Sequence, residues 1–411
     1  MTYDLIVIGG GPAGMLGAAT AGANGLKVLL LEKNEKLGKK LYLTGKGRCN
    51  VTNNGDFDDF LSNIVTNPKF LYSALSTFDN RRLIGLLESL GVRTKVERGN
   101  RVFPLSDKSS DIIKALQHHL LANKVEIRLH ATVKQILTRQ NQVCGVLLAD
   151  NTEVDSKKVL LATGGMSYTQ TGSTGDGYRM AQHLGHTITP LRPALVPLET
   201  QEPWVMDLQG LTLKNIRVQV LVQGKVKAEQ FGELLFTHFG VSGPVILTLS
   251  SLIHKYLRQP VPLNIDLKPA LSPEQLDRRL QRDFTKYAGK QLKNALDDLL
   301  PHKMIPVVLA LSGLDIHKQI DQITRQEREH LVYTFKHLRL TVQGTRPLNE
   351  AIVTGGGINT KEINPSTMES KLVNGLYFAG EIIDVDALTG GYNLQIAFST
   401  GYLSGISTAD K

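Results

Sequence analysis

The sequence is poor in cysteine and in long apolar runs, and each shortage excludes a class of protein. Its 411 residues contain two cysteines, Cys49 and Cys144. Two distant cysteines support neither a disulfide framework nor a cysteine metal cluster, and no histidine or acid cluster has metal-ligand spacing. No apolar run reaches the roughly 18 residues that a bilayer-spanning helix needs, so we expect no membrane association.

We also expect no secretory leader. A strand-like apolar run begins at residue 3, which leaves no room for a basic region and an apolar stretch ahead of it. Together with the scarcity of cysteine, this favours a cytoplasmic protein. The length exceeds that of one ordinary domain, so two or three domains are expected.

Basic residues are in moderate and uneven excess. Lys and Arg number 47 against 38 Asp and Glu, which gives a formal net charge of +9. Much of the excess lies in residues 27–48 and 81–108. These clusters are consistent with a solvated surface that also neutralises cofactor phosphates. They are equally consistent with contacts to the phosphate backbone of a nucleic acid.

The first 32 residues have the pattern of a strand, a helix and a second strand. An apolar run over 3–9 enters a glycine-rich turn, a helix of small residues covers 12–24, and a second apolar run ends at Glu32. This order predicts a parallel sheet with a right-handed crossover. Short strands over 125–162 then lead back to the same edge of that sheet.

The pattern of predicted strands and glycine-rich turns ends near Pro190 and resumes near Val342. Alternating strands are predicted after 190, with a hairpin turn at Gly224, and helices are predicted over 272–300 and 325–338. We therefore predict a discontinuous domain of residues 1–190 and 343–411. A β-rich domain (191–270) and a helical domain (271–342) interrupt it.

The turn Gly9–Gly14 has the spacing G-x-G-x-x-G directly between a strand and a helix. Gly9 allows the tight turn, Gly11 lets the backbone approach a pyrophosphate, and Gly14 lets helix and strand pack closely. The helix N-terminus adds free N–H groups and the positive end of the helix dipole. Glu32, which follows Gly14 by 18 residues, is placed to accept hydrogen bonds from ribose hydroxyls.

Two further strand ends favour FAD over a nicotinamide as the resident dinucleotide. Ala162-Thr163-Gly164-Gly165 and Phe378-Ala379-Gly380-Glu381 each close a strand, and the carboxyl ends of parallel strands meet at one edge of the sheet. A last helix opens at Gly390-Gly391-Tyr392-Asn393-Leu394-Gln395. Its free N–H groups would stabilise the charge that a flavin ring gains on reduction.

A second nicotinamide-binding domain is not predicted. No other G-x-G-x-x-G follows a strand in the middle of the chain. A reduced nicotinamide, NAD(P)H, would therefore visit the flavin only transiently.

The chain resembles the bacterial NAD(P)/FAD-dependent oxidoreductases of the aminoacetone-oxidase or bile-acid-reductase type, a family that includes flavin-dependent dihydrouridine synthases of 23S ribosomal RNA. The resemblance spans nearly the whole chain. Its segments are Gly38-Lys39-Lys40, residues 44–53 (TGKGRCNVTN), residues 236–244 (FTHFGVSGP), residues 354–357 (TGGG) and residues 380–395. It implies an α/β fold in which a Rossmann-like, glutathione-reductase-like FAD domain is interrupted by a β-barrel-like domain and a small helical domain. Tyr42 and Lys46 depart from the smaller or aliphatic residues common in the family.

The resemblance also implies cofactor contacts residue by residue. Lys39 and Lys40 would meet the flavin phosphates or ring edge, the backbone of Val133 would meet adenine, and Glu381 would replace a more usual aspartate at the ribityl chain. The full set of predicted cofactor-binding residues is Gly9, Gly11, Ala13, Gly14, Glu32, Lys33, Lys39, Lys40, Gly47, Arg48, Asn50, Val133, Ala162, Thr163, Gly164, Gly380, Glu381, Gly391, Asn393, Leu394 and Gln395.

Cys49 and His238 are the candidate catalytic acids. A thiol flanked by Arg48 could have a lowered pKa and deliver a proton beside the flavin. A small buried residue in a tight loop is the other explanation for Cys49. His238 could act as the acid or base, or could be a hydrogen-bonded histidine at a domain junction.

Three functions follow from these patterns. The first is reduction of a uridine in large-subunit ribosomal RNA to dihydrouridine with NAD(P)H, which the resemblance implies and the basic clusters fit. The second is a flavin oxidase or reductase that acts on small amines, aminoketones or enones. The third is an RNA-binding assembly factor with a structural flavin, which a complete set of flavin contacts disfavours.

Overall fold

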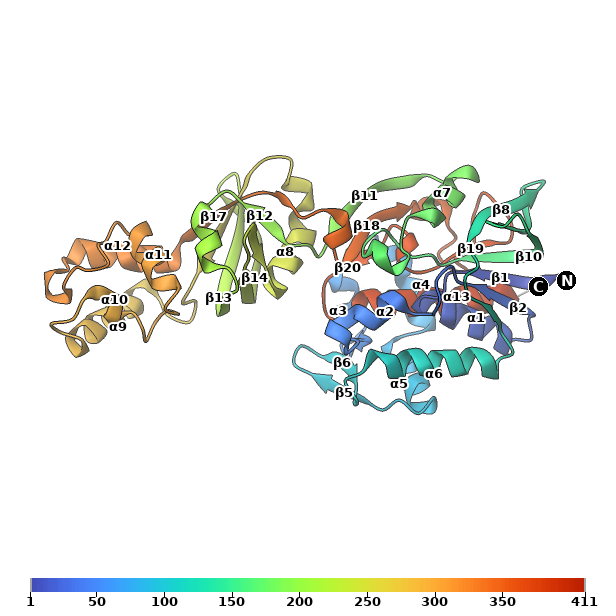
Figure 1. The fold of residues 1–411 in the computed structure, drawn as a ribbon, viewed down its shortest axis with the longest axis horizontal. Coiled ribbons are helices and arrows are strands. Elements are labelled where there is room, and N and C mark those ends of the chain that lie inside the picture. The colour runs from blue at the N-terminus through green and yellow to red at the C-terminus, as the bar shows by residue number, and fades with distance from the viewer. Residues whose placement is uncertain (1, 410–411) are drawn as a thin grey trace. The chain divides into compact units, whose positions relative to one another are not determined.

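The computed structural model describes residues 2–409, and the chain forms two compact units. The first unit joins Met1–Ala194 to Pro347–Lys411, and the second is Leu195–Arg346 (Figure 1). Each unit has hydrophobic core clusters of its own.

The first unit is built on a seven-stranded sheet with the order β7-β2-β1-β10-β9-β8, in which β19 also pairs with β10. The strands are β1 (Tyr3–Ile8), β2 (Val28–Leu31), β7 (Glu126–Arg128), β8 (Val133–Arg139), β9 (Gln142–Leu148), β10 (Glu153–Leu161) and β19 (Leu376–Phe378). Neighbours among β7, β2, β1, β10 and β19 are parallel, whereas β8 and β9 run antiparallel. The parallel strands β1, β10 and β19, far apart in sequence, therefore end at the same edge.

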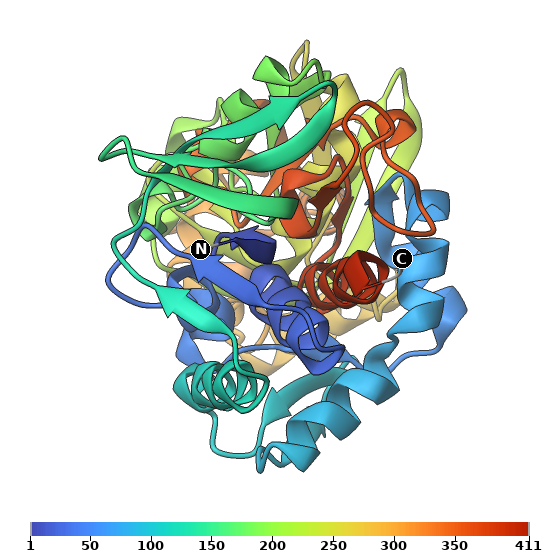
Figure 2. The same ribbon diagram turned by 90° about the vertical axis from the view of Figure 1, so that its right-hand side faces the viewer.

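The first and last helices of the chain pack backbone to backbone. A Cβ added to Gly401 in α13 (Tyr392–Ala409) would lie 2.3 Å from the Ala13 carbonyl oxygen in α1 (Pro12–Ala23). A Cβ on Gly405 would lie 2.5 Å from the Gly17 oxygen. Glycines thus let the two ends of the sequence lie side by side, as Figure 2 shows.

Smaller elements surround this sheet. The small sheets are β3 (Thr52–Asn53), β5 (Thr94–Glu97) and β6 (Arg101–Pro104), then β4 (Ile64–Thr66) with β20 (Asp386–Ala387), and β11 (Ile188–Ala194) with β18 (Val353–Ile358). The helices are α2 (Lys39–Leu43), α3 (Phe57–Asn63), α4 (Tyr72–Thr77), α5 (Asn80–Ser89), α6 (Ser109–Ala122) and α7 (Asp176–His183).

The second unit is a closed barrel with an attached helical segment. The barrel order is β12-β15-β14-β13-β16-β17. Its strands are β12 (Leu198–Thr200), β13 (Thr212–Val222), β14 (Lys225–Phe236), β15 (Gly240–Ser242), β16 (Val261–Asp266) and β17 (Leu338–Thr345). The helices are α8 (Pro244–Ile253), α9 (Pro273–Lys286), α10 (Leu292–Ala295), α11 (Met304–Leu311) and α12 (Arg325–Lys336). Barrel strands and helices share one hydrophobic core.

The helix expected over 272–300 is shorter in the structure. It begins at Pro273 behind a capping box of Ser272 and Gln275, and it ends at Lys286. Gly289 then adopts a φ of +74°, a left-handed conformation that a helix cannot continue through. The leucine periodicity alone did not reveal this interruption.

Candidate functional site

The glycine-rich turn has the geometry that a pyrophosphate requires. Gly9 has a φ of +109°, and a Cβ on it would lie 2.5 Å from the Ala162 oxygen. A Cβ on Gly14 would lie 1.9 Å from the Gly9 oxygen, so helix and strand touch through their backbones. Gly11 differs, because nothing lies within 4 Å of its Cβ position. Two glycines therefore close the turn, and the third leaves open space at the N-terminus of α1.

Glu32 holds this turn with its carboxylate. The side chain is buried, accepts a hydrogen bond from the Gly10 N–H at 2.8 Å, and accepts two more from Asn34 at 2.8 and 2.7 Å. An ionised carboxylate has about four acceptor positions, so one remains for a ribose hydroxyl. Ala131, whose N–H donates to the Glu32 carbonyl oxygen at 2.9 Å, joins this edge to β8, where Val133 is buried and paired with Leu148.

The second and third strand ends meet the turn. The Ala162 N–H donates to the Ile8 oxygen at 2.9 Å, and a Cβ on Gly380 would lie 3.0 Å from the Cβ of Ala13. Gly164 and Gly380 have positive φ angles of 73° and 79°. We call residues 9–14, 162–165 and 380–381 the cofactor edge. The structure thus brings together three segments that lie far apart in the sequence.

Two predicted contact residues carry polar atoms without a partner. The Thr163 hydroxyl and the Asn50 Oδ1 are buried, and neither has a hydrogen-bond partner within residues 2–409. Buried polar groups are nearly always paired in proteins. A polar cofactor would satisfy such atoms, so the residues present fit a bound dinucleotide.

Lys40 and Glu381 pair with each other at the cofactor edge. The Lys40 ammonium lies 2.6 Å from the Glu381 carboxylate and 2.6 Å from the Ser167 hydroxyl. Glu381 also accepts from the Ser167 hydroxyl at 3.0 Å and from the Thr354 N–H at 2.8 Å. Burial opposes ionisation of Glu381, but the Lys40 charge and these hydrogen bonds outweigh it and lower the carboxyl pKa. Lys40 therefore does not stand free to meet a phosphate.

Two other lysines predicted to contact the cofactor are also engaged elsewhere. Lys33 lies 2.6 Å from the Asp176 carboxylate and 2.7 Å from the Thr174 hydroxyl. Lys39 pairs with Glu35 at 3.2 Å. Spacing from Glu32 places these lysines near the site, but it does not show which acid each ammonium contacts.

Cys49 has the opposite electrostatic setting to the one expected. The residue is fully buried, and burial raises the pKa of its thiol to about 12, although a hydrogen bond with Thr44 acts in the other direction. The expectation of a lowered pKa is thus wrong. Arg48, which follows Gly47 and was to activate the thiol, instead pairs with Glu97 and Asp107 and lies 4.2 Å over the Phe103 ring.

The start of the last helix packs against the TGKGRCNVTN segment. A Cβ on Gly391 would lie 2.2 Å from the Thr52 oxygen, and the Thr52 hydroxyl donates to the Gln395 Oε1 at 2.6 Å. The Asn393 side chain accepts from the Ala387 N–H at 3.0 Å, and Leu394 is partly buried against the core. Thr52 and Gln395 are 343 residues apart in the sequence, and their segments form one wall beside the cofactor edge.

His238 lies in the second unit. It occupies the turn between β14 and β15, where it is exposed and lies edge-on to Phe239 with ring centroids 5.0 Å apart. Its role as an acid stays a prediction.

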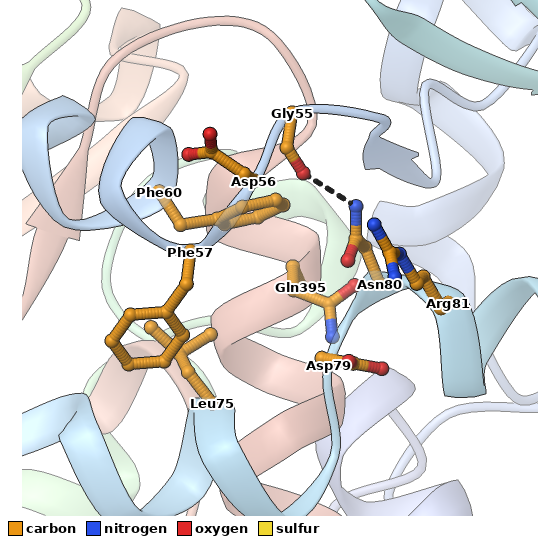
Figure 3. A pocket seen from close by; sticks show the side chains of 9 residues that line it. All are labelled: Gly55, Asp56, Phe57, Phe60, Leu75, Asp79, Asn80, Arg81 and Gln395. Atoms are coloured by element: carbon orange, nitrogen blue, oxygen red, sulfur yellow. Dashed lines mark hydrogen bonds between the residues drawn. The ribbon is translucent and has the colours of Figure 1, made fainter.

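Sequence reasoning missed two features of the first unit. One is the set of partners around Glu381, namely Ser167 and Thr354, although Thr354 opens the TGGG segment that supports the family resemblance. The other is a cavity beside Gln395 (Figure 3). Its lining comes from α3, α4, α5 and α13, and no local motif joins those segments.

Neither a metal centre nor a membrane segment is present in the part of the chain that the structure describes. No group of three or more His, Cys, Asp and Glu side chains among residues 2–409 could hold a metal ion. No described helix is both long enough and apolar enough to cross a bilayer.

Comparison with known proteins places the chain in a family. The model of the HI0933-like protein Rossmann domain matches residues 3–407. The 3-dehydro-bile acid delta(4,6)-reductase of Clostridium scindens is 32% identical over 98% of both chains. The ribosomal RNA dihydrouridine synthase of Escherichia coli is 31% identical over 97% of this chain and 96% of its own. That of Haemophilus influenzae is 32% identical over 98% and 97%.

Solved structures share the fold at low sequence identity. The 3-ketosteroid delta1-dehydrogenase of Sterolibacterium denitrificans covers 99% of both chains with a TM-score of 0.57 and 15% identity. A quinol-fumarate reductase aligns with a TM-score of 0.53 at 17% identity and covers all of this chain. At these identities the likeness shows the architecture alone.

Proposed function

Because the chain belongs to the HI0933-like Rossmann family and is an FAD-dependent oxidoreductase, we propose that it reduces a uridine of large-subunit ribosomal RNA to dihydrouridine. NAD(P)H is the proposed reductant. Two full-length relatives bear the name ribosomal RNA dihydrouridine synthase. The relative named as a bile-acid reductase is as similar, so the names alone do not select the substrate.

The single observation that carries the RNA assignment is a surface patch around Tyr42. Tyr42 and Leu43 are 51% and 43% exposed, and the Lys36 ammonium lies 5.9 Å from the Tyr42 ring. Lys46, which follows Tyr42 closely in the sequence, is exposed, and so is Lys108. The Ser109 hydroxyl donates to the Tyr42 carbonyl oxygen at 2.9 Å, which brings Lys108 close to Tyr42. We define the Tyr42 patch as Lys36, Tyr42, Leu43, Lys46 and Lys108.

Ion pairs separate this patch from five neighbouring basic residues. Lys33, Lys39, Lys40, Lys95 and Arg48 each pair with a carboxylate. By contrast, none of the three lysines of the Tyr42 patch forms an ion pair with any residue of 2–409. Unpaired cations beside an exposed aromatic ring are the side chains that contact RNA phosphates and stack on bases.

Each part of the proposed site would contact a different part of the cofactor. The turn at Gly11 and the N-terminus of α1 would hold the cofactor pyrophosphate, and Glu32 would accept from the adenosine ribose. The wall formed by Thr52 and Gly391 would border the ring. When bound, FAD supplies the hydride that one carbon of a conjugated double bond receives, while an acid must protonate the neighbouring carbon. The Cys49 thiol is buried and its pKa is raised, so Cys49 is not the acid that we propose.

A second candidate is reduction of a small enone. The specific observation in its favour is the Clostridium scindens relative, which matches over 98% of this chain. Both candidate substrates present a carbon–carbon double bond for reduction. The Tyr42 patch favours the RNA substrate, because a small uncharged enone does not need it.

Direct turnover tests the proposal. Holoenzyme reduced anaerobically with NAD(P)H is mixed with large-subunit RNA from cells that lack the gene, and separately with a 3-keto-Δ4 steroid. We expect dihydrouridine in the RNA by nucleoside mass spectrometry, and we expect Lys46→Gln to slow RNA turnover and to flatten its salt dependence. Turnover of the steroid without any dihydrouridine would instead assign the small-molecule function.

A further inference from the structure

The first unit contains a cavity that none of the predicted cofactor contacts except Gln395 lines. Its volume is about 230 Å³, and it lies between α3, α4, the start of α5 and Gln395 of α13 (Figure 3). The lining residues are Gly55, Asp56, Phe57, Phe60, Leu75, Asp79, Asn80, Arg81 and Gln395. Pockets for drug-sized ligands measure about 300–1,000 Å³, so this one suits a single flat ring system.

One side of the cavity is aromatic and leads to the surface. Phe57 and Phe60 lie on it with Leu75 (Figure 3). Phe60 meets the Tyr392 ring edge-on at 5.1 Å, and Phe57 meets the Tyr72 ring edge-on at 4.9 Å. Tyr72 is 58% exposed. The aromatic surface therefore continues from the cavity to solvent, which suits a ligand that enters ring first.

The other side offers hydrogen-bond acceptors and a cation. Asp56 and Asp79 each use one carboxylate oxygen to cap a helix, by accepting from the Asp59 N–H at 2.9 Å and the Arg82 N–H at 2.8 Å. The second oxygen of each carboxylate accepts no hydrogen bond from a lining residue. Arg81 is exposed and has no ion pair within 2–409. Acceptors for ring N–H or amino groups, with a cation beside them, match the edge of a nucleobase and its phosphate.

The cavity adjoins both the wall formed by Thr52 and Gly391 and further basic residues. Gln395 lines it and accepts from Thr52, whose carbonyl oxygen packs against Gly391. On another side, the Asn54 N–H donates to the Asn100 oxygen at 2.7 Å. That bond places the β5–β6 turn, which contains the exposed Arg98, next to Gly55, and the exposed Arg101 follows this turn at the start of β6.

We propose that this cavity holds one unstacked base of the RNA strand and so positions a neighbouring uridine for reduction. The proposal rests on the RNA function proposed above. Sequence-specific RNA recognition commonly uses bases that leave the stack, lie on aromatic side chains and hydrogen-bond through their edges. Here Phe57 supplies the aromatic face, Asp79 the acceptor and Arg81 the phosphate contact.

Binding measurements on the full holoenzyme test the proposal. The probe is a short, labelled, single-stranded RNA with one uridine among purines, compared with the same RNA carrying an abasic site beside the uridine. We expect Phe57→Leu to weaken binding of the intact RNA by about fivefold or more. The abasic site should weaken binding to the wild type and have no further effect on Phe57→Leu.

Two variants keep the test valid if Phe57→Leu folds poorly. Asp79→Asn keeps an equally good helix cap but removes the charge, so it should change the preference among purines at the flanking position. Arg81→Gln should weaken binding about threefold and reduce its salt dependence. The matched control is Arg139→Gln, an exposed arginine on β8 that does not line the cavity, which should bind as the wild type does.

The outcomes separate the cavity from the function. If the wild type reduces the RNA while Phe57→Leu, Asp79→Asn and Arg81→Gln bind both probes as it does, the cavity proposal is overturned and the RNA function stands. If the variants weaken binding of an RNA that is never reduced, the cavity stands and the function fails. If the wild type neither binds nor reduces RNA, both are overturned.

Discussion

The cofactor edge is stabilised by close backbone contacts, whereas the barrel unit is stabilised by buried side chains. At the cofactor edge, backbone meets backbone, and a single Cβ on Gly9 or Gly14 would collide with a carbonyl group. In the barrel unit, the core consists of apolar side chains such as Val218, Leu263 and Phe236, all fully buried. The first region tolerates almost no added atom, whereas the second depends on atoms that fill its interior. Substitutions at the cofactor edge should therefore lower the flavin content, whereas substitutions in the barrel core should lower the free energy of unfolding.

The largest expected effect is at Gly14. Gly14→Ala would place a Cβ 1.9 Å from the Gly9 oxygen, so the turn must shift, and we expect purified protein that retains less than about a tenth of the flavin. Gly11→Ala is the matched control, because its Cβ position is open. It should leave the melting temperature of the apoprotein unchanged and still weaken FAD binding. Equal flavin contents in both variants and the wild type would contradict this reading of the turn.

A substitution in the barrel core should lower the stability of the barrel unit without loss of flavin. Phe236→Ala empties a fully buried site, and we expect a loss of about 3–5 kcal/mol of unfolding free energy. Trp204, the single tryptophan, lies 6.2 Å from the Phe236 ring between centroids, so its fluorescence follows unfolding of this unit. Flavin absorbance follows the first unit. If the variant loses flavin before its tryptophan signal changes, the two regions do not respond separately to substitution.

The Lys40–Glu381 pair should give an intermediate and pH-dependent effect. Glu381→Gln leaves a mostly buried ammonium without its counter-charge, and we expect a loss of about 2–3 kcal/mol. Folding lowers the Glu381 pKa, so the ionised carboxylate stabilises the fold above its unfolded value of about 4.3. That stabilisation fades as the pH falls through the lower folded pKa.

Urea unfolding at several pH values measures this effect. The gap between wild type and Glu381→Gln should be constant above about pH 5 and should narrow in more acidic solution. The double variant Lys40→Met with Glu381→Gln should recover part of the loss, because no uncompensated charge remains. A gap that widens toward acid would refute the assigned direction.

Cys49→Ala should have the smallest effect. The thiol is buried with a pKa of about 12, so we expect turnover of the RNA or small acceptor to stay within about threefold of the wild type. A general acid contributes about 10²–10⁴ in rate. A loss of that size in Cys49→Ala, with flavin content unchanged, would reinstate the thiol as the proton donor.

The sequence was most informative where the backbone carries the function. Glycine spacing at Gly9 and Gly14, and the strand ends near Ala162 and Gly380, correctly predicted the Rossmann-like fold because only glycine allows such close approach. Side-chain partners were not predictable in the same way. The pairing of Lys40 with Glu381, and the burial of Cys49, depend on segments that meet only after folding.

The turn around Gly11 should hold FAD at the cofactor edge. Titration of apoprotein with FAD, followed by visible absorbance and by calorimetry, measures this binding. We expect one tightly held FAD per chain in the wild type, with binding weakened severely in Gly11→Ala although the apoprotein stays folded. A wild-type protein that takes up no flavin, or a Gly11→Ala variant that binds it equally well, would show that this turn does not hold the cofactor.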